Sequence, residues 1–303
     1  GQSFPSRPVT IVVPFAAGGP TDVLARVLGQ PMSTILGQSV VIENVTGAGG
    51  SIGVGRVVRS PADGYTLSIG QLGTHVLNGA IYSLPYDLLN DLEPIALLAS
   101  NPQMIVTKKA MPAKDLKELI AWLRANQDKT IVGTAGAGTP AHVSGAYLQD
   151  QLGLKFQFVP YRGAGPAIQD LIAGNIDLYF DQASNSLPHI RNNSIKAYAV
   201  TSNTRLPSAP DVPTADEAGL PGFTISVWHG LWAPKGTPKD VIDKINAAVR
   251  EALSDPATRQ KLADLGQDIP PPDLQTPPGL AGFQKAEADK WWPIIRAANI
   301  KAQ

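Results

Sequence analysis

The stretch Val9-Thr-Ile-Val-Val-Pro-Phe-Ala-Ala-Gly-Gly-Pro-Thr-Asp22 decides the fold of this chain. Its first seven residues are apolar or β-branched in succession, which is the pattern of a strand buried on both faces and is typical of a parallel sheet. Glycines and a proline then form a turn, and apolar residues recur at helical spacing from position 23 until Gly37, a residue type that often ends helices. The chain therefore begins with a strand, a turn and a helix.

The same alternation continues after this first unit. Strands are expected at residues 40–43, 65–69, 96–108, 130–134, 156–160, 176–180, 195–201 and 225–234. Helices are expected at residues 116–125, 141–152 and 164–173, with a short one after the glycine loop 47–55. Strands and helices in alternation predict the α/β class.

Two long extended segments predict how the domains are connected. A length of 303 residues suggests about two domains. Segments 99–107 and 226–233 are the expected crossings, because a helix capped by Thr237-Pro238 follows the second and returns to the first domain. We expect domain 1 to comprise residues 1–101 and 230–303, domain 2 to comprise 102–229, and two crossing strands to form the hinge.

Composition excludes several function classes. Lys+Arg and Asp+Glu both number 25 without a basic cluster, so nucleic acid is not an expected partner. No apolar run approaches the ~20 residues of a membrane-spanning helix. Cysteine is absent and the four histidines show no ligand spacing, so no metal or other cofactor is expected. The chain starts at Gly1 without Met or an apolar leader, so we expect a mature or trimmed protein that lacks its signal peptide.

Two glycine motifs leave enzyme functions open as alternatives. Gly49-Gly-Ser-Ile-Gly53 matches the G-x-S-x-G of hydrolases, but no strand leads directly into Ser51, and a loop that needs positive φ explains the glycines better. Gly136-Ala-Gly-Thr-Pro-Ala141 matches a dinucleotide-binding turn. The acidic residue expected about 20 positions later is missing, because that strand ends in Pro160-Tyr-Arg162.

A strand, a glycine turn and a helix occur together twice, and this repetition favours binding. The turns are Ala17-Gly-Gly-Pro-Thr-Asp22 and Gly136-Ala-Gly-Thr-Pro140, one in each expected domain. The start of a helix offers unpaired N–H groups and partial positive charge, and glycine lets a carboxylate approach the backbone. Either turn alone is equally well explained as a plain connection. Together they predict a ligand held across a cleft between the domains.

Motifs along nearly the whole chain resemble those of one family. They are Phe4-Pro-Ser-Arg-Pro8, Val13-Pro-Phe-Ala-Ala-Gly-Gly-Pro-Thr-Asp22, Gly47-Ala-Gly-Gly-Ser-Ile-Gly53, Asp63-Gly-Tyr-Thr-Leu67, Leu84-Pro-Tyr-Asp87, Gly136-Ala-Gly-Thr139, Val159-Pro-Tyr-Arg-Gly163, Pro188-His-Ile-Arg191, Ala199-Val-Thr-Ser202, Asp211-Val-Pro-Thr214 and Glu217-Ala-Gly-Leu-Pro-Gly222. In this order they resemble the Bug, or TctC-like, solute-binding proteins of tripartite tricarboxylate transporters.

The resemblance implies a two-domain Venus-flytrap, similar to type II periplasmic binding proteins. Such a protein catalyses no reaction, needs no cofactor, works as a monomer in the periplasm of a Gram-negative bacterium and passes a small carboxylate to integral membrane subunits of the transporter. The implied ligand-binding residues are Phe15, Ala17, Gly18, Gly19, Asp22, Gln71, Gly73, Thr74, His75, Thr134, Ala137, Gly138, Thr139, Asp181 and Ser184. Family members commonly have Asn after the aspartate, whereas this chain has Gln182.

The preferred ligand is expected to be an unbranched or hydroxylated dicarboxylate. Asp22 would suit a hydroxyl or amino donor on such a ligand, or a structural water, and is equally suited to the first turn of a helix. Phe15 and Trp228 could wall the apolar middle of a longer ligand, although Trp228 would fit a packed core as well. The sequence leaves the chain length of the ligand open.

Overall fold

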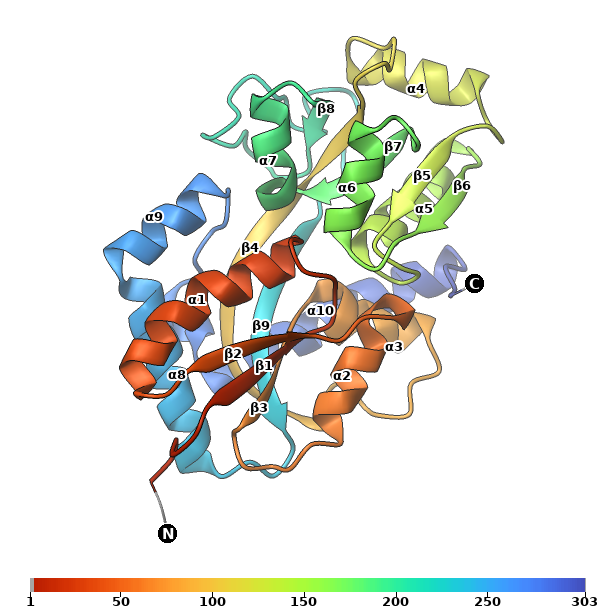
Figure 1. Ribbon diagram of the computed structural model, residues 1–303. Coiled ribbons are helices and arrows are strands. Elements are labelled where there is room, and N and C mark those ends of the chain that lie inside the picture. Colours follow the sequence, from red (N-terminus) through yellow and green to blue (C-terminus); the bar gives the residue numbers. More distant parts are fainter. Residues whose placement is uncertain (1–2, 303) are drawn as a thin grey trace.

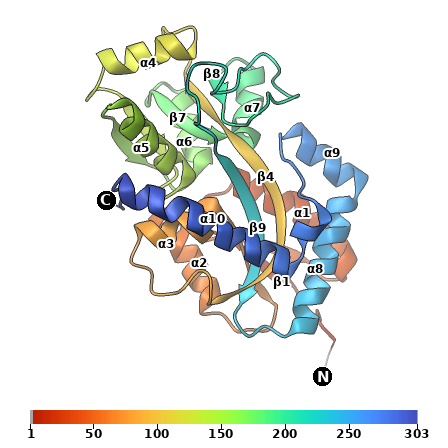
Figure 2. The same cartoon turned by 180° about the vertical axis from the view of Figure 1, so that it is seen from behind.

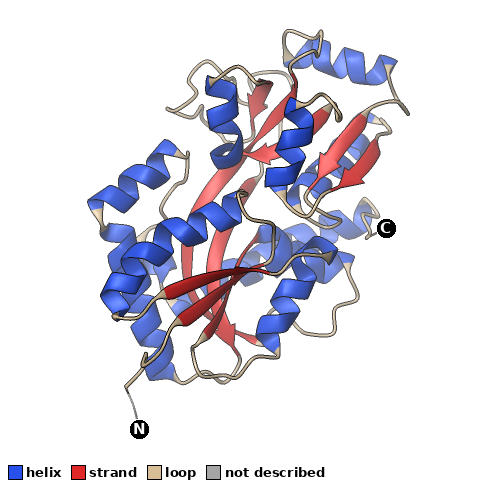
Figure 3. Cartoon of the chain, in the orientation of Figure 1, coloured by secondary structure: helices blue, strands red, loops and turns tan. Residues whose placement is uncertain are grey.

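The computed structural model describes residues 3–302. The strands are β1 (Val9–Val13), β2 (Val40–Asn44), β3 (Thr66–Gln71), β4 (Leu92–Lys108), β5 (Ile131–Thr134), β6 (Gln157–Pro160), β7 (Leu178–Gln182), β8 (Ile195–Val200) and β9 (Ser226–Pro234). The α-helices are α1 (Pro20–Leu36), α2 (Ser51–Val58), α3 (Asn78–Ile81), α4 (Leu116–Ala125), α5 (Pro140–Leu152), α6 (Ala164–Ile172), α7 (Ala183–Arg191), α8 (Lys239–Ser254), α9 (Pro256–Asp264) and α10 (Pro277–Ala297). Short helical turns are η1 (Ala48–Gly50), η2 (Gly73–Leu77) and η3 (Pro272–Gln275). Figure 3 shows helices around the strands in both halves of the molecule.

The first strand, turn and helix form as predicted. β1 is almost fully buried and pairs in parallel with both β2 and β3. α1 begins with Pro20 at its first position and ends at Gly37, whose φ of 72° is left-handed, as expected for these two residue types at the two ends of a helix. β1 thus carries the chain directly from the middle of a sheet to the start of a helix.

β4 and β9 join two sheets into one twisted assembly. The strand order is β2-β1-β3-β9-β4-β7-β5-β6, with β8 also paired to β4. β4 pairs antiparallel with β9 from Leu92 opposite Pro234 to Pro102 opposite Ser226, and its remaining length pairs with β7 and β8. Figure 1 shows these two strands running from the lower half of the molecule into the upper half. The sheet is therefore mixed, whereas the first strand alone suggested a parallel one.

The C-terminal helices pack on the first half of the molecule. α8 packs on α1, and α10 packs on β4. Figure 2, the view from behind, shows α10 in front of this half, with its C-terminal end reaching toward α5 of the other half. The fold is a mixed α/β Venus-flytrap with two connecting strands.

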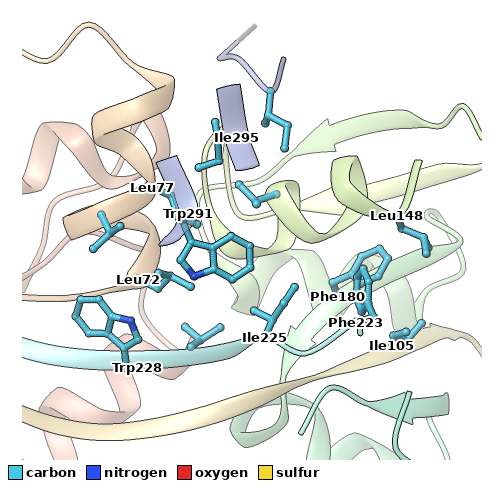
Figure 4. Close-up of a cluster of buried hydrophobic side chains, with 14 of the residues drawn as sticks. Leu72, Leu77, Ile105, Leu148, Phe180, Phe223, Ile225, Trp228, Trp291 and Ile295 are labelled. Atoms are coloured by element: carbon cyan, nitrogen blue, oxygen red, sulfur yellow. The ribbon is translucent and has the colours of Figure 1, made fainter. Parts of the chain in front are cut away.

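One hydrophobic cluster extends through both halves. Trp228 and Trp232 of β9 are 1% and 0% exposed, and both belong to the same cluster as Trp291 of α10 and Phe180 of β7. In Figure 4 the labelled side chains run from Trp228 past Trp291 to Phe180 and Phe223. Trp228 donates its indole N–H to Glu287 at 2.7 Å. Of the two roles open for Trp228, the structure supports core packing.

Two local elements were not predicted. A π-helical turn begins at Gly73, directly after β3, and runs into α3. The helix α7 was not expected, because Pro188 and several Ser and Asn residues in Ala183–Arg191 lower its helical propensity. Instead, α7 gains stability from its packing on β4, β7 and β8. Both elements border the site described below.

Candidate ligand-binding site

A cavity lies between the carboxyl ends of the strands of the two halves. The space between its walls, together with the adjoining solvent, is about 380 Å³. Its lining residues are Phe15, Gly19, Pro20, Thr21, Gln71, Gln103, Ala135, Thr139, Pro140, Ala141, Ala164, Tyr179, Phe180, Asp181 and Gln182. Ligands of open α/β sheets bind at this kind of position.

Four helix N-termini reach this cavity. α1 contributes Gly19–Thr21, α5 contributes Thr139–Ala141, α6 contributes Ala164, and α7 contributes its N-cap Gln182. The N–H groups in the first turn of a helix have no partner within the helix, and the helix dipole places partial positive charge there. No Lys, Arg or His among residues 3–302 lines the cavity. Backbone dipoles, rather than cationic side chains, therefore make this site attractive to anions.

Asp22 holds the first loop in shape. Its carboxylate is 2% exposed and accepts hydrogen bonds from the Gly18 N–H at 3.0 Å, from Arg26 Nε at 3.0 Å and from Asn44 Nδ2 at 2.9 Å. Burial alone would raise the pKa of Asp22, but these hydrogen bonds together hold it below its ordinary value. The carboxylate is ionised, is held by three donors of the protein and is absent from the cavity wall, so in this geometry Asp22 supports the loop.

The second loop is held by its own hydrogen bonds. Thr139 donates its hydroxyl to the Gly136 carbonyl at 2.7 Å, and the Gly136 N–H donates to Thr134 Oγ1 at 3.1 Å. The Gly138 N–H donates to His142 Nδ1 at 2.9 Å. The first hydrogen bond within the helix is from the Val143 N–H, so the N–H group of Ala141 has no partner within the helix, and Ala141 lines the cavity.

A buried histidine supports the hydroxyl of Thr21. His229 of β9 is fully buried, and its Nε2 lies 2.8 Å from Thr21 Oγ1, while its Nδ1 has no partner within residues 3–302. Burial lowers the pKa of His229 to about 3, so the ring is neutral near pH 7. With the ring proton on Nε2, the imidazole donates to Thr21 and leaves the Thr21 hydroxyl proton for a ligand in the cavity.

His75 lies in the core rather than in the cavity wall. Its ring stacks on Trp232 with centroids 3.8 Å apart, and its nitrogens lie 2.7 Å from Thr74 Oγ1 and 3.1 Å from Ser68 Oγ. Burial, with a smaller contribution from His229, lowers the pKa of His75 to about 3. The predicted ligand contact of His75 therefore has no support in this geometry.

The buried histidines predict a specific acid sensitivity. A neutral buried His75 contributes stability above pH 6.5 that is lost as the pH falls toward 3, because only the unfolded chain takes up the proton. We expect the pH slope of the free energy of unfolding in His75→Gln to be smaller than in the wild type by about 1.4 kcal/mol per pH unit around pH 4.5. Urea titrations at several pH values measure this slope. His189→Gln, at a less buried histidine, is the control, and an equal change in both variants would contradict the assignment.

The cavity includes five of the predicted ligand residues. Phe15, Gly19, Gln71, Thr139 and Asp181 line it. The remaining predicted residues lie behind or beside it: Ala17, Gly18, Asp22, Gly73, Thr74, His75, Thr134, Ala137, Gly138 and Ser184. Among these, Gly18 and Ser184 line a separate cavity between α1 and α7, where the space between the walls, together with the adjoining solvent, is about 560 Å³.

Several lining residues were missed by the sequence analysis. Gln103, on β4, was detectable as a buried polar side chain within an apolar strand. Tyr179 and Phe180 carried no such signal, because an aromatic residue in a buried strand is normally core. Thr21 was part of the quoted turn, but only the three-dimensional structure shows that its hydroxyl faces His229.

The loops of the two halves contact each other directly around the cavity. The Ala16 N–H donates to the Arg162 carbonyl at 3.0 Å, and the Tyr82 hydroxyl donates to the Ala137 carbonyl. Gly49, with φ of 63°, lies so close that a Cβ there would overlap the Ala137 carbonyl oxygen. These contacts describe a closed arrangement of the two halves.

Comparison with known proteins shows the family. The sequence signature of the TctC family, described as the tripartite tricarboxylate transporter family receptor, matches residues 24–300. The chain belongs to the TctC family. This result confirms the resemblance inferred from the motifs.

Solved structures of TctC-like proteins have the same fold. The periplasmic binding protein BugD superposes with a TM-score of 0.96 at 39% identity, covering 99% of this chain and 100% of that one. MatC from Rhodopseudomonas palustris, determined with bound malate, gives 0.94 at 42% identity, with coverages of 96% and 100%. The R. palustris protein Rpa4515, determined with adipate, gives 0.94 at 32% identity, with coverages of 99% and 100%.

TctC proteins are periplasmic solute-binding proteins and not enzymes, so the two enzyme alternatives are set aside. Consistent with this, Ser51 of the G-x-S-x-G motif donates its hydroxyl to the Ala48 carbonyl at 2.7 Å. Positive φ at Gly47, Gly49 and Gly50 confirms the loop explanation of that motif. Within residues 3–302, no helix is both long and apolar enough to cross a membrane.

Proposed function

We propose that this TctC protein captures a small dicarboxylate in the cavity between its domains and delivers it to the membrane subunits of a tripartite tricarboxylate transporter. The convergence of four helix N-termini on one cavity is the observation that carries this proposal. Malate in MatC and adipate in Rpa4515 are both dicarboxylates and support the ligand class. The similar protein BugD is a periplasmic binding protein, and we propose the same location for this chain.

The proposed ligand contacts come from both halves. One carboxylate would accept hydrogen bonds from the first turn of α1 at Thr21, and the other from the first turn of α5 at Ala141. Charge-assisted hydrogen bonds of this kind are stronger than neutral ones, and ordered water can extend them at little cost. We propose Phe15, Gly19, Gln71, Thr139 and Asp181 as further contacts. The other predicted residues except His75 would shape the loops.

Ligand binding would favour the closed state, because only that state brings both sets of N–H groups to one ligand. We propose residues 1–101 with 230–303 and residues 102–229 as the units that move, with β4 and β9 as the hinge. The Ala16–Arg162 and Tyr82–Ala137 hydrogen bonds join these units in the closed arrangement. The predicted monomeric state fits a ligand held within one chain.

Tyr82→Phe is expected to weaken dicarboxylate binding several-fold to about tenfold, because one hydrogen bond that exists only in the closed state is lost. The unliganded protein should keep its melting temperature. Isothermal titration with malate measures the change. Tyr86→Phe is a matched control, since its hydroxyl donates to the Ser51 carbonyl within the first unit. Equal loss of affinity in both variants would contradict a specific role in closure.

A thermal-shift screen tests the ligand class. The purified protein would be heated with C4 to C9 dicarboxylates, malate, citrate, aspartate, nicotinate and NAD(P)H. A ligand present at about 100 times its Kd adds about 2.7 kcal/mol to the free energy of unfolding, which gives a clear upward shift. We expect a shift with at least one dicarboxylate. A shift with NAD(P)H and with no carboxylate would overturn the proposal.

A further inference from the structure

A buried asparagine lies at the point where β4 passes from one half of the molecule to the other. Pro102 is the last residue of β4 that pairs with β9, and Gln103 is the first that pairs with β7. Asn101, immediately before them, is 0% exposed. Its side chain is therefore enclosed at the proposed hinge.

Both ends of the Asn101 amide are hydrogen-bonded, and the partners belong to different halves. Its Oδ1 accepts the Ser184 N–H at 2.8 Å, in the second half. Its Nδ2 donates to the Gly266 carbonyl at 2.7 Å and to the Leu265 carbonyl at 3.5 Å, in the first half. All three partners are backbone groups of fixed polarity, so the orientation of the amide is determined. One side chain thus joins the two halves at the hinge.

The bond from Ser184 fixes the start of α7. This helix begins at Ala183, so the Ser184 N–H is one of the groups that have no partner within the helix. The two residues that precede the helix, Asp181 and Gln182, line the ligand cavity. The Asn101 amide therefore holds a part of the second half that reaches the cavity.

A loop of the first half, residues 265–267, packs directly on α7. A Cβ added at Gly266 would lie 3.2 Å from Leu187 Cδ1. Ser100 and Asp268 exchange two backbone hydrogen bonds, of 2.8 and 2.7 Å, which tie this loop to β4. The loop is therefore a fixed surface against which the start of α7 is held.

Asn101 differs in position from the other hydrogen bonds between the halves. The two bonds described above, from the Ala16 N–H and from the Tyr82 hydroxyl, join loops around the cavity, and these loops separate when the halves open. Asn101 lies on β4 itself, and atoms close to a hinge move least during a rotation. Its bonds to both halves are therefore expected to persist in the open state.

We propose that Asn101 is the pivot of domain closure, the residue that holds the first turn of α7 against loop 265–267 while the halves rotate. Because this connection is kept, closure brings the start of α7 to the ligand in one orientation. Asn101 is absent from the cavity wall, so it is a positioning residue and not a ligand contact. This inference rests on the proposed function and names the residue that guides closure.

Isothermal titration of Asn101→Leu with malate and with adipate tests this role. Leucine has the same branching as asparagine but no polar atoms, so the Ser184 N–H and the Gly266 carbonyl lose their partner. We expect the affinity for the dicarboxylate that the wild type binds to fall by about tenfold, because the start of α7 is no longer held in place.

Asn246→Leu is the matched control. Asn246 of α8 is also a buried asparagine, and its Nδ2 donates to the carbonyls of Ile95 and Gln275 at 2.8 and 2.7 Å, all within the first half. Both variants should lower the melting temperature, whereas the affinity of Asn246→Leu should stay within about twofold of the wild type. The comparison separates positioning from a general loss of stability.

Hydrogen exchange without any ligand tests the pivot separately. The exchange rate of the Ser184 amide can be resolved by mass spectrometry with fragmentation of the peptide. We expect this amide to be protected in the unliganded wild type, and to exchange at least about tenfold faster in Asn101→Leu, because its hydrogen bond is present before closure.

Three results would overturn the assignment. They are an Asn101→Leu variant with wild-type affinity, an equal loss of affinity in Asn246→Leu, and a Ser184 amide that is unprotected in the unliganded wild type. The last needs no variant, so the proposal remains testable even where Asn101→Leu fails to fold. If no carboxylate bound the folded wild type, the proposed function itself would fail, whereas hydrogen exchange would still show whether Asn101 holds α7 before closure.

Discussion

Gly49→Ala is expected to weaken dicarboxylate binding by about two orders of magnitude. In the closed arrangement, the new Cβ would overlap the Ala137 carbonyl oxygen and approach the Tyr82 hydroxyl to 2.8 Å. The second domain would have to remain displaced by about 1 Å, a shift large enough to disrupt hydrogen bonds that depend on exact alignment. Isothermal titration with malate measures the loss of affinity.

Gly37→Ala separates the effect on closure from the effect of backbone strain. Gly37 has φ of 72° and an added Cβ would meet nothing within 4 Å. Alanine at either position therefore costs about 1 kcal/mol of stability through its left-handed conformation. Only Gly49→Ala should lose affinity. An unchanged Kd in Gly49→Ala, or an equal change in both variants, would contradict the closed-state contact.

Trp232→Ala is expected to have the largest effect on stability, a loss of about 3–5 kcal/mol. Trp232 is fully buried and stacks on His75. Its indole N–H donates to Gln284 Oε1 at 3.2 Å, while Gln284 Nε2 donates to the His75 carbonyl at 2.8 Å. Alanine would leave a cavity and also an unpaired amide oxygen on α10, so both packing and hydrogen bonding are lost.

Urea unfolding followed by circular dichroism measures this loss, and the melting temperature should fall by roughly 6–15 °C. Trp122→Ala is the control, because Trp122 of α4 is only partly buried at the edge of the cluster. Trp122→Ala should lower the free energy of unfolding by clearly less than Trp232→Ala. A loss under 1.5 kcal/mol in Trp232→Ala would show that α10 is not anchored through this residue.

Much of the fold could be predicted because its signals are local. The β1–α1 unit depends on a run of β-branched residues and on Pro20 and Gly37 at the two ends of the helix. The crossing strands were detectable as long apolar segments. The mixed order of the sheet was not detectable in the sequence, because the antiparallel pairing of β3 with β9 joins residues more than 150 positions apart. Helix α7 was missed because its stability comes from tertiary packing.

The site was predicted less completely than the fold. Glycine turns indicated two of the helix N-termini that reach the cavity, and Gly19 and Thr139 line it. The sequence could not show which polar atoms the protein already uses. Asp22 is occupied and Gln182 is not, although both are polar residues beside a helix start. That difference depends on the side chains of Arg26 and Asn44, whose contacts only the folded chain shows.

A crystal structure of the protein grown with malate tests the proposed binding site. We expect one malate in the described cavity, with carboxylate oxygens within roughly 3.2 Å of the N–H groups of Thr21 and Ala141, directly or through one ordered water. Malate bound elsewhere, or held by Lys or Arg side chains while these helix N-termini stay unoccupied, would contradict it.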